Sequence, residues 1–124
     1  MEVLKKVLLT GASSGIGKAI AKRLLEEGFE VYGVGRNFRE DSLEIRSNPL
    51  FHAISCDLLE DSAGEKIKQK VLADGRDIDV LINNAGTAYY GLHENIRPEE
   101  IHEMVRLNLE VPMVLSRLFL SSMK

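Results

Sequence analysis

The stretch that decides the fold is Thr-Gly-Ala-Ser-Ser-Gly-Ile-Gly at residues 10–17, which lies between an apolar run and an amphipathic one. Its glycines let the backbone turn tightly and approach another molecule without a Cβ in between. The helix expected after the turn starts with N–H groups that have no intrahelical partner and carry the positive end of the helix dipole. Strand, glycine turn and helix in this order predict a cradle for a phosphate group.

Strand-like and helix-like segments alternate on both sides of this turn. The apolar runs predict strands over residues 3–9, 30–35, 51–55 and 79–83. The periodic stretches predict helices over 15–27, from Asp61 or Ser62 to about 73, and from Pro98 to the end, with a short helix within 37–48 and a loop over 86–91. The apolar stripe of the first helix is expected to be Ile16, Ala19, Ile20, Leu24 and Leu25, and that of the 61–73 helix Ile67, Val71 and Leu72.

This alternation predicts an α/β protein with a Rossmann-like, doubly wound parallel sheet and helices on both faces. The expected strand order is 3-2-1-4, which is a dinucleotide-binding fold truncated after its fourth strand. The 124 residues are enough for one domain with a hydrophobic core, so we expect a single domain over residues 1–124.

Composition excludes several classes of function. A net charge of −3 without a basic stripe argues against nucleic acid as a partner, and no apolar run is long enough for a membrane span. The single cysteine, Cys56, cannot form an internal disulfide, which fits a cytoplasmic protein, and we expect it to be a small buried residue at a strand end. The spacing of the histidines with one another and with Cys56 predicts no metal site.

Two other motifs overlap the glycine turn. Gly-x-Ser-x-Gly at residues 11–15 matches the nucleophile elbow of acyl hydrolases, with Ser13 as nucleophile. Such an enzyme also needs a later acid and histidine, for which Asp57, Asp61, His93 and His102 are available without any feature that singles them out. A phosphate-binding P-loop is disfavoured, because residues 12 and 19 are alanines where that motif needs glycine and a hydroxyl residue.

Other residues decide between these motifs. Thr-Gly-x-x-x-Gly-x-Gly at 10–17 is followed by Asp57 after the third strand and by Asn-Asn-Ala-Gly at 83–86 after the fourth. In these motifs and their separation the chain resembles the classical short-chain dehydrogenase/reductase family, from Val3 to the last helix. The resemblance implies the N-terminal, NAD(P)-binding part of such an enzyme.

The resemblance also implies a layout for a dinucleotide cofactor. The adenosine and pyrophosphate side would be lined by the glycine turn, Asp57 and Leu58 would lie at the adenine ring, and residues 84–86 would lie beside the riboses. The expected cofactor-binding residues are Gly11, Ser13, Ser14, Gly15, Ile16, Gly17, Arg36, Asp57, Leu58, Asn84, Ala85 and Gly86. Considered alone, Asp57 is equally a cap of a helix or turn.

The residues at the end of the second strand indicate which dinucleotide is preferred. A carboxylate there would bind the ribose hydroxyls of NAD, but this chain has Gly35 followed by Arg36. A guanidinium can make a charge-assisted contact with a 2′-phosphate, so we expect NADP(H) over NAD(H). The expectation depends mainly on Arg36, because Ser14 is neutral where some NADP-preferring members of the family carry a second basic residue.

Asn108 matches the asparagine of the family's Asn-Ser-Tyr-Lys catalytic tetrad. In a helix the N–H of residue 112 would bond to the carbonyl of residue 108, but residue 112 is a proline. We therefore expect a kink that frees the Asn108 carbonyl to hold a water, which in the family feeds the proton relay.

The serine and the Tyr-x-x-x-Lys of the tetrad are not found in residues 1–124, nor is the substrate-binding part. The resemblance thus implies a parent enzyme that transfers hydride between NADP(H) and a carbonyl or alcohol, with no expected turnover by this chain alone. The alternative is a non-enzymatic dinucleotide-binding sensor or partner subunit.

Two features predict association into a homodimer or higher oligomer. The fourth strand would have an unpaired apolar edge, which tends to pair with another chain. The last helix has two apolar sides, only one of which can cover the sheet. The predicted sides are Ile101, Val105, Leu109 and Leu115 against Met104, Leu107, Val111, Val114 and Leu118.

Overall fold

The computed structural model describes residues 4–38, 43–87 and 91–124. In chain order its elements are β1 (Lys6–Thr10), α1 (Gly15–Glu26), β2 (Glu30–Gly35), α2 (Leu43–Arg46), β3 (Phe51–Ser55), α3 (Ala63–Val71), the 3₁₀ turn η2 (Leu72–Asp74), β4 (Val80–Ile82), the 3₁₀ turn η3 (His93–Asn95), α4 (Pro98–Val105), the π-helical turn η4 (Arg106–Glu110) and α5 (Val111–Met123). The predicted strands and helices are confirmed, with β4 shorter than expected; Val3, the predicted start of the first strand, lies outside the described residues.

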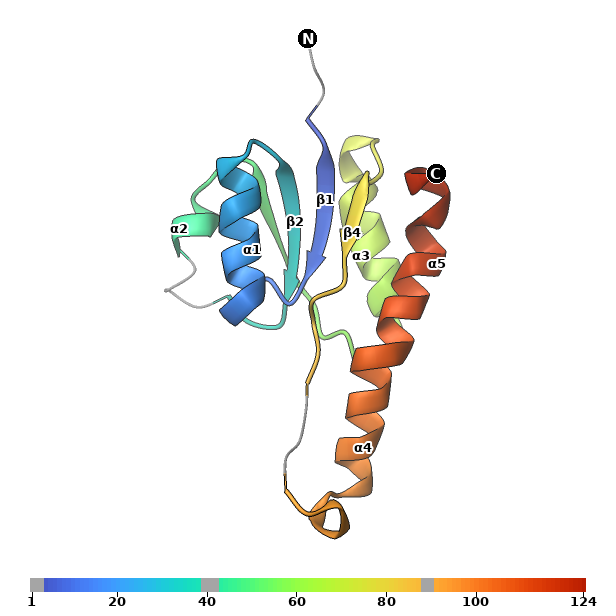
Figure 1. The fold of residues 1–124 in the computed structure, drawn as a ribbon. Helices are drawn as coiled ribbons and strands as arrows, with labels where there is room; N and C mark the ends of the chain where they lie inside the picture. The colour runs from blue at the N-terminus through green and yellow to red at the C-terminus, as the bar shows by residue number, and fades with distance from the viewer. Residues whose placement is uncertain (1–3, 39–42, 88–90) are drawn as a thin grey trace.

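The four strands form one parallel sheet in the predicted order, β3-β2-β1-β4 (Figure 1). β1 pairs with neighbours on both sides, so that Leu9 lies opposite Gly33 of β2 and Ile82 of β4. A strand in this position is buried on both faces, and each residue of β1 is buried. The fold class is therefore the Rossmann-like one that the alternation of segments predicts.

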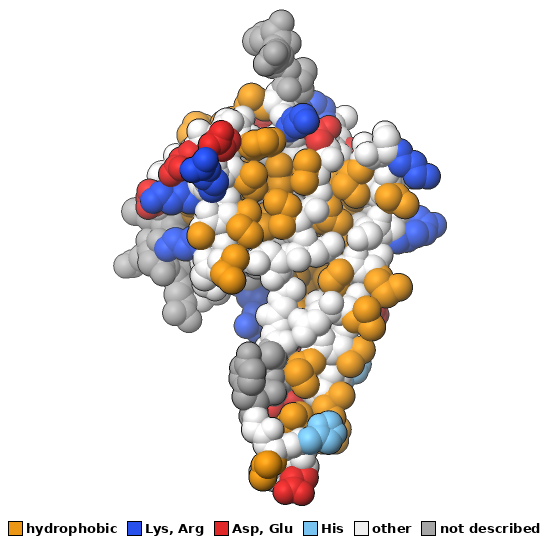
Figure 2. Space-filling view, viewed as in Figure 1, with side chains coloured by type: hydrophobic (Ala, Val, Ile, Leu, Met, Phe, Trp, Pro, Cys, Tyr) orange, Lys and Arg blue, Asp and Glu red, His pale blue; other side chains and the backbone are white. Residues whose placement is uncertain are grey.

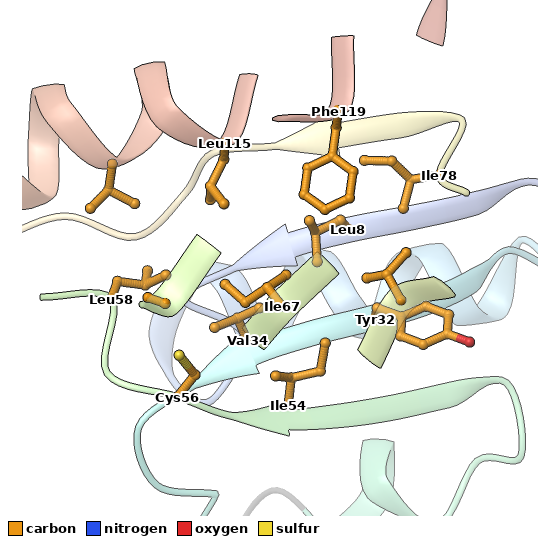
Figure 3. Close-up of a cluster of buried hydrophobic side chains, with 13 residues drawn as sticks. Leu8, Tyr32, Val34, Ile54, Cys56, Leu58, Ile67, Ile78, Leu115 and Phe119 are labelled. Carbon is orange, nitrogen blue, oxygen red and sulfur yellow. The ribbon is translucent and has the colours of Figure 1, made fainter. Parts of the chain in front are cut away.

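Successive residues of each strand point to opposite faces of the sheet, which produces two cores. On one face Leu8 and Val34 pack against α3 and α5, with Leu115 and Phe119 of α5 pointing toward the strands (Figure 3). On the other face Leu9 packs with residues of α1 and α2. Figure 1 shows these helices as layers on either side of the sheet.

The predicted stripe of α1 is confirmed in part, because Leu25 is buried and Ile20 and Leu24 pack against the core. Ile16 is 75% exposed and Ala19 is exposed as well, whereas the buried residues are Gly17, Ala21 and Leu25. A Cβ at Gly17 would overlap the carbonyl oxygen of Gly11, so the helix starts in close contact with the turn before it. Because α1 approaches the turn so closely, the side of the helix with its smallest residues faces inward. A pattern of large apolar residues does not predict this side.

In α3 the prediction holds for Ile67 and Val71, which are buried, but is wrong for Leu72. The α-helix ends at Val71 and the chain continues as η2, whose tighter winding turns Leu72 outward. Gly75 then ends the segment with a φ of +83°. Ser62 stands at the N-cap position, as expected, but its side chain makes no capping hydrogen bond.

The predicted kink near Pro112 takes the form of a π turn. Because Pro112 has no N–H, the regular helical bond to residue 108 cannot form. In η4, just before the proline, the N–H of Val111 donates to the carbonyl of Arg106, five residues back. Figure 1 shows α4 and α5 joined through this turn into one long rod.

The π turn also changes which side of the rod faces the sheet. An extra residue in one turn rotates the following helix relative to the preceding one. Leu115, predicted on the same side as Ile101 and Leu109, is instead buried, and Val114, predicted on the other side, is exposed. The buried side of α5 is Val111, Leu115 and Phe119.

A buried cation holds the start of β1 to the segment before β4. The ammonium of Lys6, whose side chain has no exposed surface, donates to the carbonyls of Val71 (2.6 Å) and Arg76 (2.8 Å) and to the carboxylate of Asp74 (2.7 Å). It also lies 4.5 Å from the centre of the Tyr32 ring. A buried charge is tolerated when its donors are satisfied in this way. Lys6 therefore fixes the end of α3 against the sheet.

Replacing Asp74 with asparagine should lower the free energy of unfolding near neutral pH. The hydrogen bond from Lys6, and then the one from the backbone N–H of Arg76, lower the pKa of Asp74 from 3.8 to about 2. A lowered carboxyl pKa stabilises the fold above pH 3.8, and this contribution is lost as the pH falls toward about 2. Urea unfolding of the wild type and of Asp74→Asn should therefore differ at neutral pH and converge in this window.

Lys6→Met serves as the matched control, because it removes the other half of the same pair. The free energy of unfolding of Lys6→Met should depend less on pH than that of the wild type over the same window. An Asp74→Asn curve that runs parallel to the wild type at every pH would contradict this account.

Candidate functional site

Loops from all four strands meet at the carboxyl edge of the sheet and enclose a cavity of about 270 Å³. This edge is where open parallel sheets bind ligands. The lining residues come from the turn after β1, the end of β2, the loops after β3 and β4, and the rod of α4 and η4: Gly11, Ser13, Ser14, Val34, Gly35, Arg36, Cys56, Asp57, Leu58, Leu59, Ala85, Gly86, Thr87, Glu103 and Leu107.

The structure brings together most of the residues that the sequence predicts for a cofactor site. Eight of them line the cavity: Gly11, Ser13, Ser14, Arg36, Asp57, Leu58, Ala85 and Gly86. Gly15 and Asn84 each stand next to one of these residues in the chain, and Asn108 contacts the cavity wall through its side chain. Ile16 and Gly17 do not line the cavity, since Ile16 is 75% exposed and Gly17 is buried against the carbonyl of Gly11. Contact of any of these residues with a cofactor remains a prediction.

The glycine turn has the tight backbone conformation that its sequence predicts. Gly11 and Gly15 have φ angles of +68° and +57°, in the left-handed region that favours glycine. A Cβ at Gly11 would come within 2.9 Å of Asn84 Nδ2, whereas one at Gly15 would face open space. The N-terminus of α1 begins here, and the Ser14 side chain makes no capping hydrogen bond to it. Ser14 therefore does not occupy the first N–H groups of α1, which are the groups that favour an anion at a helix N-terminus.

Thr10 joins this turn to the loop after β4. Its buried hydroxyl oxygen accepts hydrogen bonds from the backbone N–H groups of Asn84 and Ala85, each at 3.0 Å. The Asn84 side chain donates in return to the carbonyl of Gly11 at 3.2 Å. The two segments that carry the predicted motifs, 74 residues apart at Thr10 and Asn84, are therefore one hydrogen-bonded unit.

The loop after β3 forms another wall. The Asp57 carboxylate accepts the N–H of Leu59 at 3.0 Å, which is the turn-capping role considered for it. Cys56 is buried as predicted, and burial raises the pKa of its thiol, so it has little thiolate character. The cytoplasmic location inferred from this cysteine stays a prediction.

Asn108 lies in η4 and holds the loop after β4 by both ends of its amide. Its Oδ1 accepts the N–H of Thr87 at 2.9 Å, and its Nδ2 donates to the Thr87 carbonyl at 2.6 Å. A Cβ at Gly86 would come within 2.6 Å of Asn108 Oδ1, so any other residue there would displace the Asn108 amide. A water on the Asn108 carbonyl and a role in proton relay remain predictions.

Several wall residues carry no signal in the sequence. Leu59 and Thr87 line the cavity from the loops after β3 and β4, and Glu103 and Leu107 line it because α4 and η4 pass across the edge of the sheet. Thr10, by contrast, belongs to the glycine motif, and its spacing from Asn84 could have suggested the contact.

The other chemistries considered from the sequence gain no support from the geometry. None of the described residues that line the cavity is a histidine, the base that a hydrolase triad places beside its serine. Within residues 4–38, 43–87 and 91–124, no three histidine, cysteine or acidic side chains form a group that could bind a metal ion. In the same part of the chain, no helix has the length and apolar character needed to cross a membrane.

Replacing Thr10 with valine should lower the free energy of unfolding by about 1–3 kcal/mol, because the isosteric side chain leaves two N–H groups without their acceptor. Thr10→Ser, which keeps the hydroxyl, is the matched control and should retain most of the stability. Chemical denaturation monitored by circular dichroism measures both variants. A Thr10→Val protein as stable as the wild type would show that the hydroxyl does not hold the two loops together.

Comparison with known proteins agrees with this geometry. The sequence profile described as short chain dehydrogenase matches residues 5–124. A serine 3-dehydrogenase of Agrobacterium fabrum (strain C58 / ATCC 33970) is 45% identical over 84 residues, which cover 66% of this chain and 33% of that protein. The chain thus spans about a third of the length of this relative.

Two solved structures have the same fold. A short-chain dehydrogenase from Streptomyces avermitilis superposes with a TM-score of 0.86 at 35% identity, over 98% of this chain and 45% of that one. A metagenomic short-chain oxidoreductase in complex with NADP has a TM-score of 0.84 at 32% identity, over 96% of this chain and 56% of that one. Because the family profile matches nearly the whole length of this chain, the chain belongs to the short-chain dehydrogenase family.

Proposed function

We propose that this chain is the nucleotide-binding part of a short-chain dehydrogenase/reductase that uses NADP(H). The whole protein would transfer a hydride between NADP(H) and a carbonyl or alcohol substrate. The observation that carries the proposal is the cavity at the carboxyl edge of the sheet, where Thr10 ties the glycine turn to residues 84–86.

The residues present suit a dinucleotide. The open space beside Gly15 and the N-terminus of α1 would receive the pyrophosphate, because backbone N–H groups and the helix dipole favour an anion there. Asp57 and Leu58 would lie at the adenine, and Ala85 and Gly86 beside the riboses. When bound, the nicotinamide would supply or accept the hydride.

Arg36 supports NADP(H) over NAD(H). It is exposed at the end of β2 and lines the cavity, where its guanidinium can pair with a 2′-phosphate. Gly35 before it packs closely on Ser13, since a Cβ at position 35 would come within 2.7 Å of the serine Cβ. The related metagenomic oxidoreductase, crystallised with NADP, lends support to this choice.

Asn108 is the one residue of the catalytic tetrad within residues 1–124. Its carbonyl lies in η4, where the regular helical pattern is broken, and would hold a water that feeds the proton relay. The proton donor and the group that orients the substrate carbonyl would come from outside these residues. We therefore expect this chain to bind the cofactor without turnover. A dinucleotide sensor or partner subunit would behave in the same way.

Arg36→Asp should weaken NADPH binding by about tenfold or more, the size of one lost hydrogen bond to a charged group, and leave NADH binding unchanged or tighter. The chain has no tryptophan, so the fluorescence of the bound nicotinamide can be titrated directly. Arg23→Asp, at an exposed position of α1 outside the cavity, makes the same change of charge and should not alter the preference. An unchanged ratio of NADPH to NADH affinity in Arg36→Asp would refute the assignment.

We also infer that the chain associates with a second copy of itself. Apolar side chains run along the outer side of the α4–α5 rod (Figure 2). The exposed ones on the rod are Ile101, Val105, Leu109, Met113, Val114 and Leu120. An apolar stripe of this kind is typical of an interface.

Light scattering should find a dimer or larger species, and Leu109→Glu with Met113→Glu should shift the population toward the monomer. Lys70→Glu, an exposed change on α3 outside the rod, is the control for charge alone. A wild-type chain that stays monomeric at high concentration would rule out this association.

A further inference from the structure

Arg106 opens η4, and its guanidinium binds three partners from two parts of the chain. Nε donates to the Leu59 carbonyl at 2.9 Å, Nη1 to Glu110 Oε1 at 2.6 Å and Nη2 to Asp61 Oδ1 at 3.2 Å. Its side chain is only 15% exposed. Arg106 thereby connects the helical rod to the loop after β3.

The backbone of Leu59 is hydrogen-bonded through both its N–H and its carbonyl. Its N–H donates to the Asp57 carboxylate, and its carbonyl accepts from Arg106. Leu59, Asp57 and Leu58 all line the cavity, so these two bonds help to position that wall. The buried side chains of Cys56 and Leu58 anchor the start of the loop in the core, and the guanidinium fixes its far end to the rod.

The opposite wall is held by the same π turn. Two residues after Arg106, the Asn108 amide makes two hydrogen bonds to the backbone of Thr87, which also lines the cavity. η4 therefore reaches both the loop after β3 and the loop after β4. The turn thereby connects the two loops across the cavity through Arg106 and Asn108.

The ion pairs of Arg106 with Asp61 and Glu110 contribute little to the position of the loop after β3. The Asp61 side chain is fully exposed, at 103% of its reference area, and that of Glu110 is 52% exposed. Exposed pairs of this kind contribute little to stability because water screens them. The bond to the Leu59 carbonyl is part-buried and joins two elements, so it is the contact with a structural consequence.

We propose that Arg106 is a positioning residue of the nucleotide site. It acts through the Leu59 carbonyl to hold the adenine-side wall at a set distance from the wall that Asn108 holds. This inference rests on the proposed function, because the walls matter for a ligand only if the cavity binds the dinucleotide.

Titration of the whole chain with NADPH, and with adenosine 2′,5′-bisphosphate as a probe of the adenine side, tests the proposal. Arg106→Ala should weaken both by about tenfold, the effect of losing one charge-assisted hydrogen bond. Arg106→Lys, which can still donate to Leu59, should restore most of the affinity. Asp61→Asn and Arg117→Ala should bind as the wild type does, because neither changes the Leu59 contact.

Hydrogen exchange gives a readout that needs no ligand. Arg106→Ala should speed exchange at the N–H groups of Leu59 and Thr87 while those of β1 and β2 keep their protection. A fall in overall stability alone would instead raise exchange throughout the sheet.

The two measurements separate the possible failures. If the wild type does not bind NADPH but Arg106→Ala frees both amides, the proposed cofactor is wrong and the positioning role stands. If Arg106→Ala binds NADPH as tightly as the wild type, the positioning role is wrong and the cofactor stands. The role is equally overturned if Asp61→Asn loses as much affinity as Arg106→Ala, because the effect would then come from the ion pair.

Discussion

The Thr10 hydroxyl accepts the N–H groups of Asn84 and Ala85, and the site depends on these two bonds. They lock the turn after β1 to the loop after β4, which lie on neighbouring strands but far apart in the chain. Each loop alone has glycines and could adopt many conformations, at an entropic cost if it is ordered by a ligand. Because the bonds form on folding, the cavity is organised in advance.

The two ends of the sheet have different tasks. At the start of β1 the buried Lys6 ammonium binds two carbonyls and Asp74, so this end contributes stability. At the opposite end Arg36 lines the cavity, and α1 begins beside it without a side-chain cap from Ser14. A buried cation needs all its donors satisfied, whereas a binding site needs donors that a ligand can satisfy. Because the strands are parallel, the buried cation lies at one edge of the sheet and the binding cavity lies at the other.

η4 links the hydrophobic core between α5 and the sheet to the site. Pro112 cannot take part in a regular helix at this point, and the chain responds with a π turn that begins at Arg106 and contains Asn108. The turn rotates α5 so that Leu115 and Phe119 cover the sheet. It also directs the side chains of Arg106 and Asn108 to two different loops of the cavity. One local break in the helix therefore determines both packing and the shape of the site.

By itself the sequence determined the parallel sheet, its strand order and most of the cavity wall, because hydrophobic periodicity, glycine spacing and the ends of strands are local features. It misplaced Ile16 and Leu115 and did not indicate Thr87, Leu59 or the clamp of Arg106. Those depend on contacts between segments many residues apart: the close approach of α1 to its own turn, and the extra residue that η4 adds to the helix. Tertiary structure decided them because a side chain's surroundings are set by which elements pack together, and that information is not contained in any one segment.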